Sequence, residues 1–272
     1  GAELPDIPHM EFVEHDVIKP YDWTGPLDYV VHAAGIASPF YYRKYPLETL
    51  DVAITGTKNM LVLAQRHQAR ITFFSSSEIY GDPDAAHVPT LESYRGNVAA
   101  QGPRACYDES KRVGETLCYI FHENHGLATN TIRPFNVFGP GMQETDYRVM
   151  PNFANRIKGG RALNVYGSGN QTRTFCYITD AMNGFLRVIA AGVPGEAYNI
   201  GNPKPEISML ELVERIEGVL GKELARHIIE YPDSYPADEP MRRSPDITKA
   251  RRQLGFGPRV TLEDGLGRFL KW

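Results

Sequence analysis

The chain has little of what marks an exported, membrane-spanning or metal-binding protein. Its 272 residues include three cysteines, Cys106, Cys118 and Cys176, which form no C-x-x-C pair and no even framework. We therefore expect reduced thiols in a cytoplasmic protein. No apolar stretch approaches the roughly 20 residues that a transmembrane helix needs, so a membrane is not an expected partner. His, Cys, Asp and Glu show no metal-ligand spacing, and no metal site is predicted.

Positive charge is also scarce. The formal net charge is −4, whereas nonspecific binding to nucleic acid needs clustered Lys and Arg, so nucleic acid is not an expected partner. Hydrophobic residues make up 42% of the chain and charged residues 23%, which is close to globular averages and argues against wholesale disorder. The length suffices for one large or two small domains.

A glycine-rich turn is missing from the start of the chain. Sheets that bind dinucleotides usually open with a strand, such a turn and a helix, whose N-terminus faces the pyrophosphate. No G-x-x-G-x-x-G or G-x-G-x-x-G precedes His32, and His15, Asp16 and Val17 read as the end of a second strand. We therefore expect the first β-α unit to be missing and the chain to be truncated, because a sheet without that unit would expose long unpaired edges.

Strand-like and helix-like runs alternate through the first half of the chain. Residues 27–32, 70–75 and 128–132 read as buried strands; residues 46–65 and 107–124 read as helices, the second closed by Gly126. This order predicts an α/β fold, a Rossmann-like doubly wound parallel sheet with helices on its faces. Ligands of such sheets gather at the carboxyl ends of the strands, where residues 33–35, 75–78 and 133–136 fall.

Elements become shorter after residue 141. We expect residues 1–141 to form a NAD-binding domain and residues 142–272 mainly a smaller α/β substrate domain, with a segment near 174–200 returning to the first. Residues 174–178 read as a strand. Asp180 is a predicted N-cap for the helix that follows, and Ser208 with Glu211 a predicted capping box.

Tyr107 and Lys111 form a Y-x-x-x-K pattern inside the second predicted helix. The spacing places a phenol and an ammonium one turn apart on the same face. A free tyrosine has a pKa of about 10, and a nearby Lys⁺ favours the phenolate. We expect a Tyr107 whose pKa is lowered toward neutrality, able to take a proton from a sugar hydroxyl while hydride leaves the same carbon.

Six segments resemble the extended short-chain dehydrogenase/reductase family, also described as NAD-dependent epimerases and dehydratases. The resemblance covers nearly all of residues 10–270, and several such segments in order are more specific than any one of them. They read SSSEIYGDP from Ser75, GPRACYDESKR from Gly102, RPFNVFGP from Arg133, VYGSGNQTRTF from Val165, YNIGNP from Tyr198 and RRSPDI from Arg242.

Ser77 and Glu78 point to one branch of that family. Its 4,6-dehydratases carry Asp-Glu at these positions and its 4-epimerases usually neither carboxylate, whereas Ser-Glu is similar to the decarboxylases of UDP-glucuronate. The resemblance thus implies NAD-dependent decarboxylation through a 4-keto intermediate to UDP-xylose or a UDP-4-keto-pentose. A 4-epimerase, a 4,6-dehydratase and a noncatalytic nucleotide-sugar-binding module remain alternatives. The chain departs from the decarboxylases in residues 33–35, where they usually have Leu-Ala-Ser, and at Ala53, where Asn is common.

The resemblance also implies roles for single residues. Tyr107 would be the base, Lys111 its partner, Ser76 a proton relay, and Ser77 and Glu78 would lie near C5 and C6 of the sugar. Arg173 would grip either the substrate carboxylate or the diphosphate. NAD would lie against Asp16, Val17, Ala33, Ala34, Gly35, Ser75, Tyr107, Lys111 and Pro134, and the UDP-sugar against Asn136, Arg148, Tyr166, Gln171, Arg173 and Arg243.

An alternative for each of these arginines is a surface salt bridge, the commoner fate of a lone Arg. The resemblance further implies a homodimer in which residues 46–65 and 107–124 of two subunits form a four-helix bundle.

Overall fold

A four-stranded parallel sheet forms the centre of the molecule. The computed structural model describes residues 7–143, 146, 148–231 and 240–272. The strand order is β1-β2-β3-β8, with every neighbouring pair parallel. The middle strands are almost wholly buried, as expected of a sheet covered on both faces. The strands are β1 (Tyr29–His32), β2 (Arg70–Phe74), β3 (Thr129–Pro134) and β8 (Ala197–Ile200).

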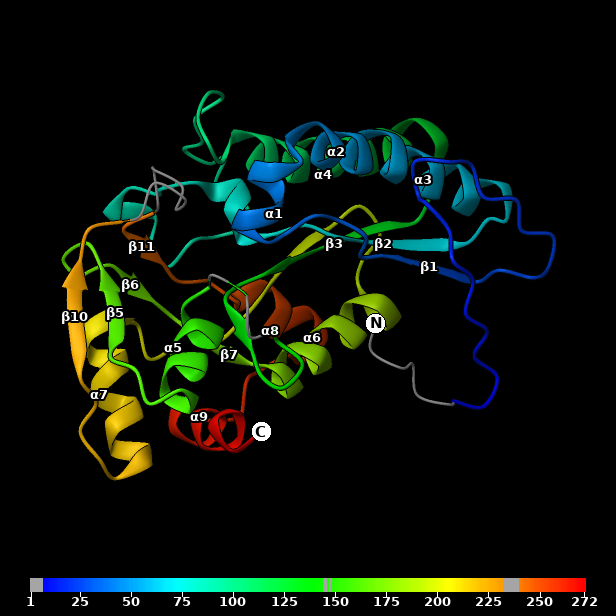
Figure 1. The fold of residues 1–272 in the computed structure, drawn as a ribbon. Coiled ribbons are helices and arrows are strands. Elements are labelled where there is room, and N and C mark those ends of the chain that lie inside the picture. The colour runs from blue at the N-terminus through cyan, green and yellow to red at the C-terminus, as the bar shows by residue number, and fades with distance from the viewer. Residues whose placement is uncertain (1–6, 144–145, 147, 232–239) are drawn as a thin grey trace.

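Three helices cover one face of this sheet (Figure 1). They are α2 (Pro46–Asp51), α3 (Thr57–Arg66) and α4 (Ala105–His125). The helix predicted over residues 46–65 is present, but a π-helical turn, η1 (Val52–Gly56), interrupts it. A short helix that was not predicted, α1 (Pro39–Lys44), precedes them. Gly126 ends α4 in the left-handed conformation at φ 66°, which confirms the predicted C-cap.

Helices α6 (Ile178–Ala191) and α8 (Thr248–Leu254) cover the other face (Figure 1). The prediction that Asp180 is the N-cap of α6 is wrong, since Tyr177 occupies that position. Asp180 lies in the first turn, and its carboxylate accepts hydrogen bonds from the backbone N–H groups of Arg259 and Val260 at 2.8 and 2.7 Å. The sequence therefore indicated that this carboxylate binds backbone N–H groups, but it named the wrong ones.

A second lobe contains the remaining strands and helices. Strands β5 (Leu163–Tyr166) and β10 (Arg226–Ile229) pair with each other, and β11 (Arg242–Arg243), β6 (Thr172–Arg173) and β9 (Ile207–Ser208) form a small mixed sheet. The strand predicted over residues 174–178 is reduced to β7 (Cys176–Tyr177), which pairs with β4 (Val137–Phe138). The helices are α5 (Val149–Lys158), α7 (Met209–Leu220) and α9 (Leu262–Lys271).

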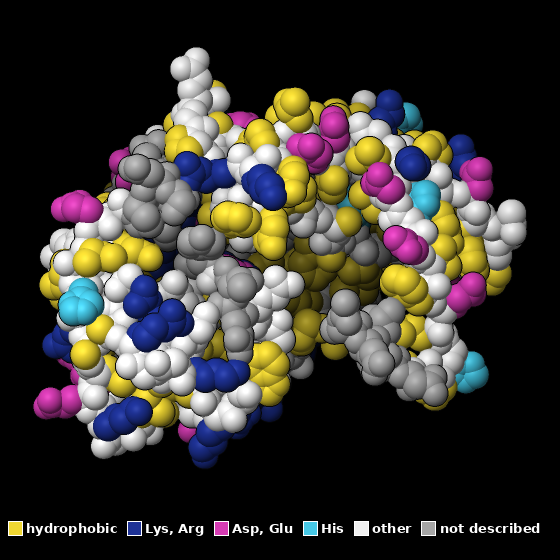
Figure 2. Space-filling model, in the orientation of Figure 1, with side chains coloured by type: hydrophobic (Ala, Val, Ile, Leu, Met, Phe, Trp, Pro, Cys, Tyr) yellow, Lys and Arg dark blue, Asp and Glu magenta, His cyan; other side chains and the backbone are white. Residues whose placement is uncertain are grey.

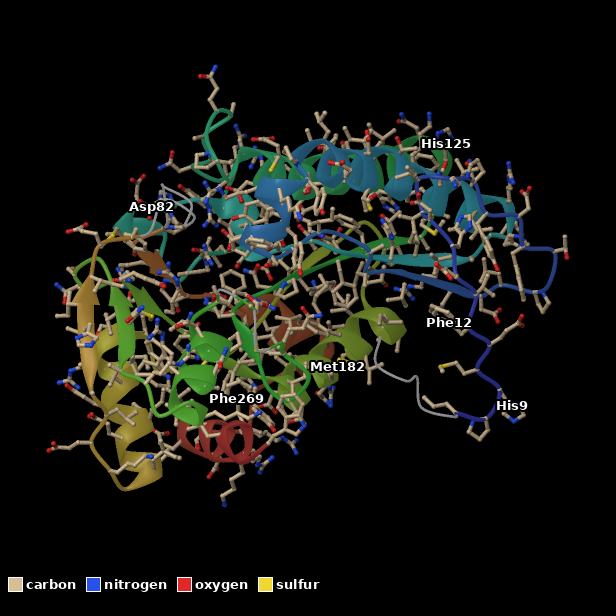
Figure 3. All side chains as sticks on the ribbon, viewed as in Figure 1. His9, Phe12, Asp82, His125, Met182 and Phe269 are labelled. Atoms are coloured by element: carbon tan, nitrogen blue, oxygen red, sulfur yellow. The ribbon has the colours of Figure 1, made fainter. Side chains whose placement is uncertain are left out.

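The second lobe has a hydrophobic core of its own. Phe138, Leu212 and Phe269 belong to it, and Figure 3 labels Phe269 on α9. Ser208 and Glu211 form the predicted capping box at the start of α7: the Ser208 hydroxyl accepts from the Glu211 N–H at 3.1 Å, and the Glu211 carboxylate accepts from the Ser208 N–H at 2.7 Å. The domain division at residue 141 stays a prediction.

The first described residues, 7–28, contain no strand, so the interpretation of His15, Asp16 and Val17 as a strand end is wrong. This segment instead runs beside α3, where the Val17 carbonyl accepts a hydrogen bond from Asn59 at 2.9 Å. The expectation of a missing first β-α unit stays a prediction. In the described part of the chain, no helix is both long and apolar enough to cross a membrane.

Candidate active site

A cavity of about 380 Å³ lies beyond the carboxyl ends of β2 and β3, between the sheet and the second lobe. Figure 2 shows this side of the molecule hollowed in its middle, with hydrophobic side chains in the hollow. Residues of both lobes line the cavity: Ser76 follows β2, Asn136 follows β3, and Tyr166 ends β5. The strand ends thus meet where a parallel sheet is expected to bind its ligand.

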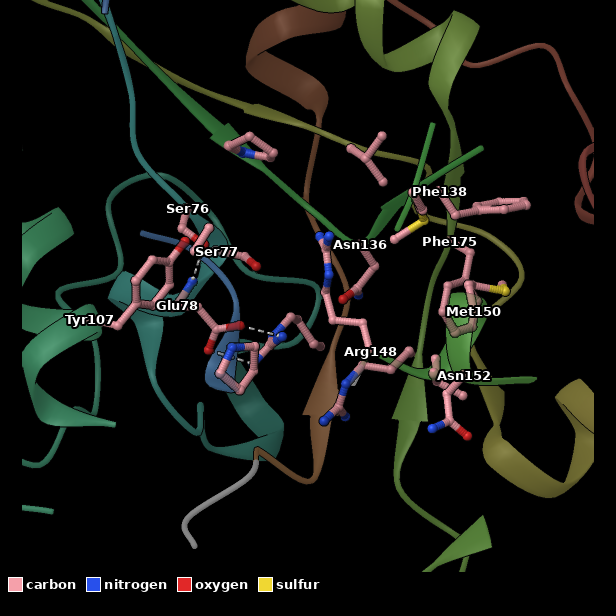
Figure 4. A pocket seen from close by; sticks show the side chains of 18 of the residues that line it. Ser76, Ser77, Glu78, Tyr107, Asn136, Phe138, Arg148, Met150, Asn152 and Phe175 are labelled. Carbon is pink, nitrogen blue, oxygen red and sulfur yellow. Dashed lines mark hydrogen bonds and ion pairs between the residues drawn. The ribbon is translucent and has the colours of Figure 1, made fainter. Parts of the chain in front are cut away.

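The segment after β2 contributes three adjacent side chains to one side of the cavity. Ser76 caps the 3₁₀ turn η2 (Ser77–Tyr80), because its hydroxyl accepts a hydrogen bond from the Glu78 N–H at 3.2 Å. In Figure 4, Tyr107 of α4 points toward Ser76 and lies beside Ser77 and Glu78, with Arg148 on the opposite side. The predicted base and its predicted relay therefore lie together.

Tyr107 and Lys111 face the same cavity, as their spacing predicts. The Lys111 ammonium lies 5.9 Å from the centroid of the Tyr107 ring and donates a hydrogen bond to the Phe74 carbonyl at 2.9 Å. Gly35 is close to this ammonium, since an added Cβ would lie 3.2 Å from Nζ. A side chain at position 35 would compete for the space around the Lys111 charge.

The pKa of Tyr107 differs from the expectation. Burial raises it to about 12, and Glu78 and Asp108 raise it too, whereas the hydrogen bond with Ser76 and the charge of Arg148 lower it. Burial also lowers the pKa of Lys111 to about 8. Because burial penalises the charged form of each group, this arrangement alone keeps Tyr107 a neutral phenol, opposite to the direction predicted from the Y-x-x-x-K pattern.

Two arginines hold the Glu78 carboxylate. Arg243 of β11 donates to both of its oxygens, at 2.7 and 2.8 Å, and Arg104 at the N-terminus of α4 donates to Oε2. Arg243 was a predicted substrate residue, but no role was predicted for Arg104. It precedes Tyr107 by three residues and so lies one turn away on the same helix face, which is the signal that could have identified it.

Polar and aromatic side chains of the second lobe line the far end of the cavity. The Gln171 amide donates to the Tyr166 carbonyl and to the Tyr231 hydroxyl, both at 3.1 Å, and the rings of Tyr166 and Tyr231 lie 5.8 Å apart. Arg173 donates to the carbonyl of Thr172 at 2.8 Å. Tyr231 was not predicted as a site residue, because it follows a strand outside every family-like segment.

The cavity brings together fourteen of the predicted site residues. These are Ala33, Ser75, Ser76, Ser77, Glu78, Tyr107, Lys111, Pro134, Asn136, Arg148, Tyr166, Gln171, Arg173 and Arg243. Asp16, Val17, Ala34 and Gly35 do not line it; Asp16 accepts a hydrogen bond from the Ile18 N–H at 3.2 Å. The roles of all these residues stay predictions.

Comparison with known proteins identifies the family. The profile of the NAD dependent epimerase/dehydratase family matches residues 6–201. The chain belongs to this family. UDP-glucuronic acid decarboxylase 5 of Arabidopsis thaliana is 42% identical over 259 residues, which cover 95% of this chain and 73% of the relative.

Two solved enzyme structures show the same fold. The UDP-glucuronic acid 4-epimerase of Bacillus cereus, in complex with UDP-glucuronic acid and NAD, is 26% identical with a TM-score of 0.79, over 90% of this chain and 74% of that one. The dTDP-glucose 4,6-dehydratase DesIV of Streptomyces venezuelae, with NAD bound, has the same identity and TM-score, over 90% of this chain and 72% of that one. These similarities agree with the predicted family.

Unpaired polar atoms in the cavity test whether the residues of this family member fit a dinucleotide and a nucleotide sugar. Among the described residues, buried lining atoms without a hydrogen-bond partner include Ser75 Oγ, Asn136 Nδ2, Asn152 Oδ1 and Arg243 Nε. Buried polar groups are normally paired, so donors and acceptors left open here fit polar ligands. Ser75, Lys111 and Pro134 line this cavity, with the Lys111 ammonium bonded to the carbonyl of Phe74 beside Ser75, and their chemistry is compatible with the predicted cofactor.

Proposed function

We propose that this protein is an NAD-dependent decarboxylase that converts UDP-glucuronate, through a 4-keto intermediate, into UDP-xylose or a UDP-4-keto-pentose. One observation carries the proposal: Ser76, Ser77 and Glu78 adjoin Tyr107 in a cavity that also contains Arg148, Arg173 and Arg243. A nucleotide-sugar acid carries three or more negative charges, and these arginines can offset them. The 42% identity with a UDP-glucuronic acid decarboxylase supports the same substrate.

Tyr107 and Ser76 perform the oxidation step in this proposal. Ser76 takes the proton of the sugar 4-hydroxyl and passes its own to the Tyr107 oxygen, while hydride leaves C4. NAD⁺, when bound, supplies the hydride acceptor and a positive charge that favours the phenolate. Lys111 holds the cofactor side of the cavity and remains anchored to the Phe74 carbonyl.

Loss of CO₂ then follows from the chemistry of the intermediate. The 4-ketone is β to the C6 carboxylate, so the electrons of the breaking C5–C6 bond flow into the carbonyl and give an enolate at O4. The Tyr107 hydroxyl, protonated in the preceding step, donates to that oxygen and stabilises its charge. Ser77 and Glu78 lie nearest the position proposed for C5 and C6, where a proton must replace CO₂.

The nucleotide end of the substrate occupies the second lobe. Asn136, Arg148 and Arg173 offer donors to the diphosphate, whose oxygens prefer guanidinium and amide groups. Tyr166 and Gln171 line the uridine end, where an aromatic face and an amide can hold a base. Arg173 is close enough to serve either the diphosphate or the carboxylate, and both assignments remain part of the proposal.

Two other reactions use the same scaffold. The solved 4-epimerase and 4,6-dehydratase share the fold, and a 4-keto intermediate is common to all three reactions. A dehydratase is less favoured because Ser77 stands where its relatives carry Asp. A noncatalytic binding module is less favoured because Tyr107, Lys111 and Ser76 are all present and face the cavity.

Incubation of the full-length protein, including any segment encoded before Gly1, with NAD⁺ and UDP-glucuronate tests the proposal. We expect release of CO₂ together with a UDP-pentose product, and no turnover of UDP-glucose. Release of UDP-galacturonate without CO₂ would establish the 4-epimerase instead, and a 4-keto-6-deoxy sugar formed from a nucleotide hexose would establish the dehydratase. Nucleotide-sugar binding without any turnover would leave only the binding module.

The proposal extends to a homodimer in the cytoplasm. Large apolar side chains are exposed on α2, η1 and α4, namely Leu47, Ile54, Tyr119 and Ile120. These helices lie side by side on one face of the sheet, and two copies could pair them into a four-helix bundle (Figure 1). Light scattering of the Leu47→Glu, Tyr119→Glu variant should then give half the mass of the parent. The three free cysteines support the cytoplasmic location.

A further inference from the structure

Arg104 connects two buried carboxylates beside Tyr107. It donates to Glu78 Oε2, and its Nε lies 3.8 Å from Oδ2 of Asp108. The side chains of Arg104, Glu78 and Asp108 are only 8%, 14% and 9% exposed, so solvent screens their charges weakly. Glu78, in the turn after β2, lines the cavity together with Tyr107, and Asp108 is the residue that follows Tyr107 on α4.

We propose that Arg104 is a positioning residue: it neutralises Glu78 and Asp108 together, and so allows the neighbouring Tyr107 to give up its proton during turnover. The inference rests on the proposed function, because it assigns Arg104 a part in the step that needs a Tyr107 base. Arg104 touches neither the reacting carbon nor the cofactor in this arrangement, and it acts through the two carboxylates.

The charges around Tyr107 show why this one cation matters. Glu78 and Asp108 both raise the pKa of the phenol, which burial has already raised to about 12. A negative charge nearby disfavours a phenolate, and the effect grows as solvent is excluded. Arg243 also pairs with Glu78, so Arg104 is one of two cations beside that carboxylate and lies close to Asp108 as well.

Other groups face Tyr107 from each neighbouring element and stay unchanged when Arg104 is replaced. Of these, Arg148 at the start of α5 lowers the pKa of the phenol. The other charged and titratable groups of this region are Lys111 and Cys106 on α4, Tyr42 on α1, Arg173 on β6, Arg243 on β11, and His32 on β1, which is close to Lys111. Glu78 and Asp108 are the two groups that lose a cation.

The pH dependence of kcat tests the proposal in the NAD-loaded full chain. Activity should rise with pH as the Tyr107 base forms. In Arg104→Met, this rise should move to higher pH by about one unit or more, because two carboxylates lose their shared cation. In Asp108→Asn, it should move to lower pH. Arg104→Lys, which keeps the charge, should recover part of the parent profile, and KM for UDP-glucuronate should change less than kcat in all three.

A second readout does not require turnover. The absorbance of tyrosinate can be titrated in each variant and in the same variant carrying Tyr107→Phe, and the difference reports Tyr107 alone. We expect the Tyr107 titration to move in the same directions as the kcat profile. Arg66→Met is the matched control, since Arg66 pairs with Asp22 on the surface, where the side chains are 59% and 83% exposed.

The outcomes separate the inference from its premise. If UDP-glucuronate is not decarboxylated but the tyrosinate titrations move in opposite directions in Arg104→Met and Asp108→Asn, the proposed function fails and the electrostatic role stands. If the variants lose activity equally at every pH with unmoved titrations, Arg104 is merely structural and the inference is overturned. If Arg104→Met fails to fold, Asp108→Asn and Arg104→Lys test the inference in its place. A pH profile of kcat that does not move in Asp108→Asn also overturns the inference.

Discussion

The ring of Tyr107 on α4 stacks on the ring of Tyr42 on α1, with centroids 5.1 Å apart and planes inclined by 12°. Tyr42 is almost fully buried, so it presents a fixed surface to the phenol. This contact orients the Tyr107 ring through its face and leaves the hydroxyl to Ser76. The ring of Tyr107 therefore sets its orientation, and its hydroxyl is left for proton transfer.

Replacing Tyr107 by Phe should separate those two parts. Phe keeps the stacked ring and the fold but lacks the hydroxyl, so we expect kcat to fall by about 10³-fold, within the range of general acid–base catalysis. Steady-state assays of CO₂ release measure the loss, and circular dichroism checks the fold. Tyr119→Phe on the same helix is the control, because Tyr119 does not line the cavity and Phe keeps its ring for the proposed dimer contact, so parental activity should remain. A Tyr107→Phe enzyme with near-normal kcat would remove Tyr107 from the mechanism.

Protonation of His32 should lower the free energy of unfolding at acidic pH. The side chain is buried and hydrogen-bonded to the Thr57 hydroxyl at 3.0 Å, and burial together with the charge of Lys111 lowers its pKa from 6.5 to about 4. Between pH 4 and pH 6.5, His32 therefore binds a proton in the unfolded state but not in the folded state. The buried neutral imidazole therefore contributes about 3 kcal/mol to the free energy of unfolding above pH 6.5, and this contribution is lost as the pH falls through 4.

Urea unfolding at pH 7 and at pH 4 measures this contribution. The free energy of unfolding should fall less between the two pH values in His32→Asn than in the parent. Other acidic groups titrate in the same window, so the comparison uses the difference between variant and parent. An identical fall in both proteins would show that His32 does not carry the effect.

Arg133 and Glu115 form a buried ion pair whose loss should be costly. Arg133 donates to both Glu115 oxygens at 2.9 and 2.6 Å and to the Tyr80 hydroxyl at 2.7 Å, which anchors the turn that carries Glu78. Arg133→Met leaves Glu115 without its partner and should cost about 3–5 kcal/mol. The double variant Arg133→Met, Glu115→Leu should lose less stability than that. Urea unfolding of Arg133→Met, Glu115→Leu and the double variant tests the coupling. A double variant as unstable as the sum of the single ones would contradict it.

Gly114 allows α4 to lie close against β2. A Cβ at this position would meet Cζ of Phe73 at 2.3 Å, so Gly114→Ala should force the helix or the ring to move at a cost of about 1–3 kcal/mol. Gly218 of α7 has no atom within 4 Å of an added Cβ, so Gly218→Ala should be neutral or gain up to about 1 kcal/mol. Thermal unfolding of the two variants compares them. Equal midpoints would mean that the contact is easily relieved.

The sequence predicted the parts of the site that depend on local pattern. Runs of apolar residues located β1, β2 and β3, although only alternate residues of β1 are buried, not the whole strand as predicted. The rule that ligands gather at strand ends placed Ser76 at the ligand edge of the sheet, and the family resemblance placed it beside Tyr107. It could not predict the direction of the Tyr107 pKa shift, because burial depends on what distant segments cover. The partners of Asp180 on residues 259 and 260 and of Glu78 on α4 and β11 were missed for the same reason: no periodic pattern records contacts between segments so far apart.

Glu78 and Arg243 are 165 residues apart in the sequence, yet they form one ion pair. A backbone hydrogen bond from the Thr90 N–H to the Ser244 carbonyl, at 2.9 Å, fastens the same late segment. On the ribosome, strand β2, which precedes Ser76, and helix α4, which carries Tyr107, are made long before Arg243 emerges. These two elements can therefore form early, but the cavity lacks the Arg243 part of its lining until that late segment has been released.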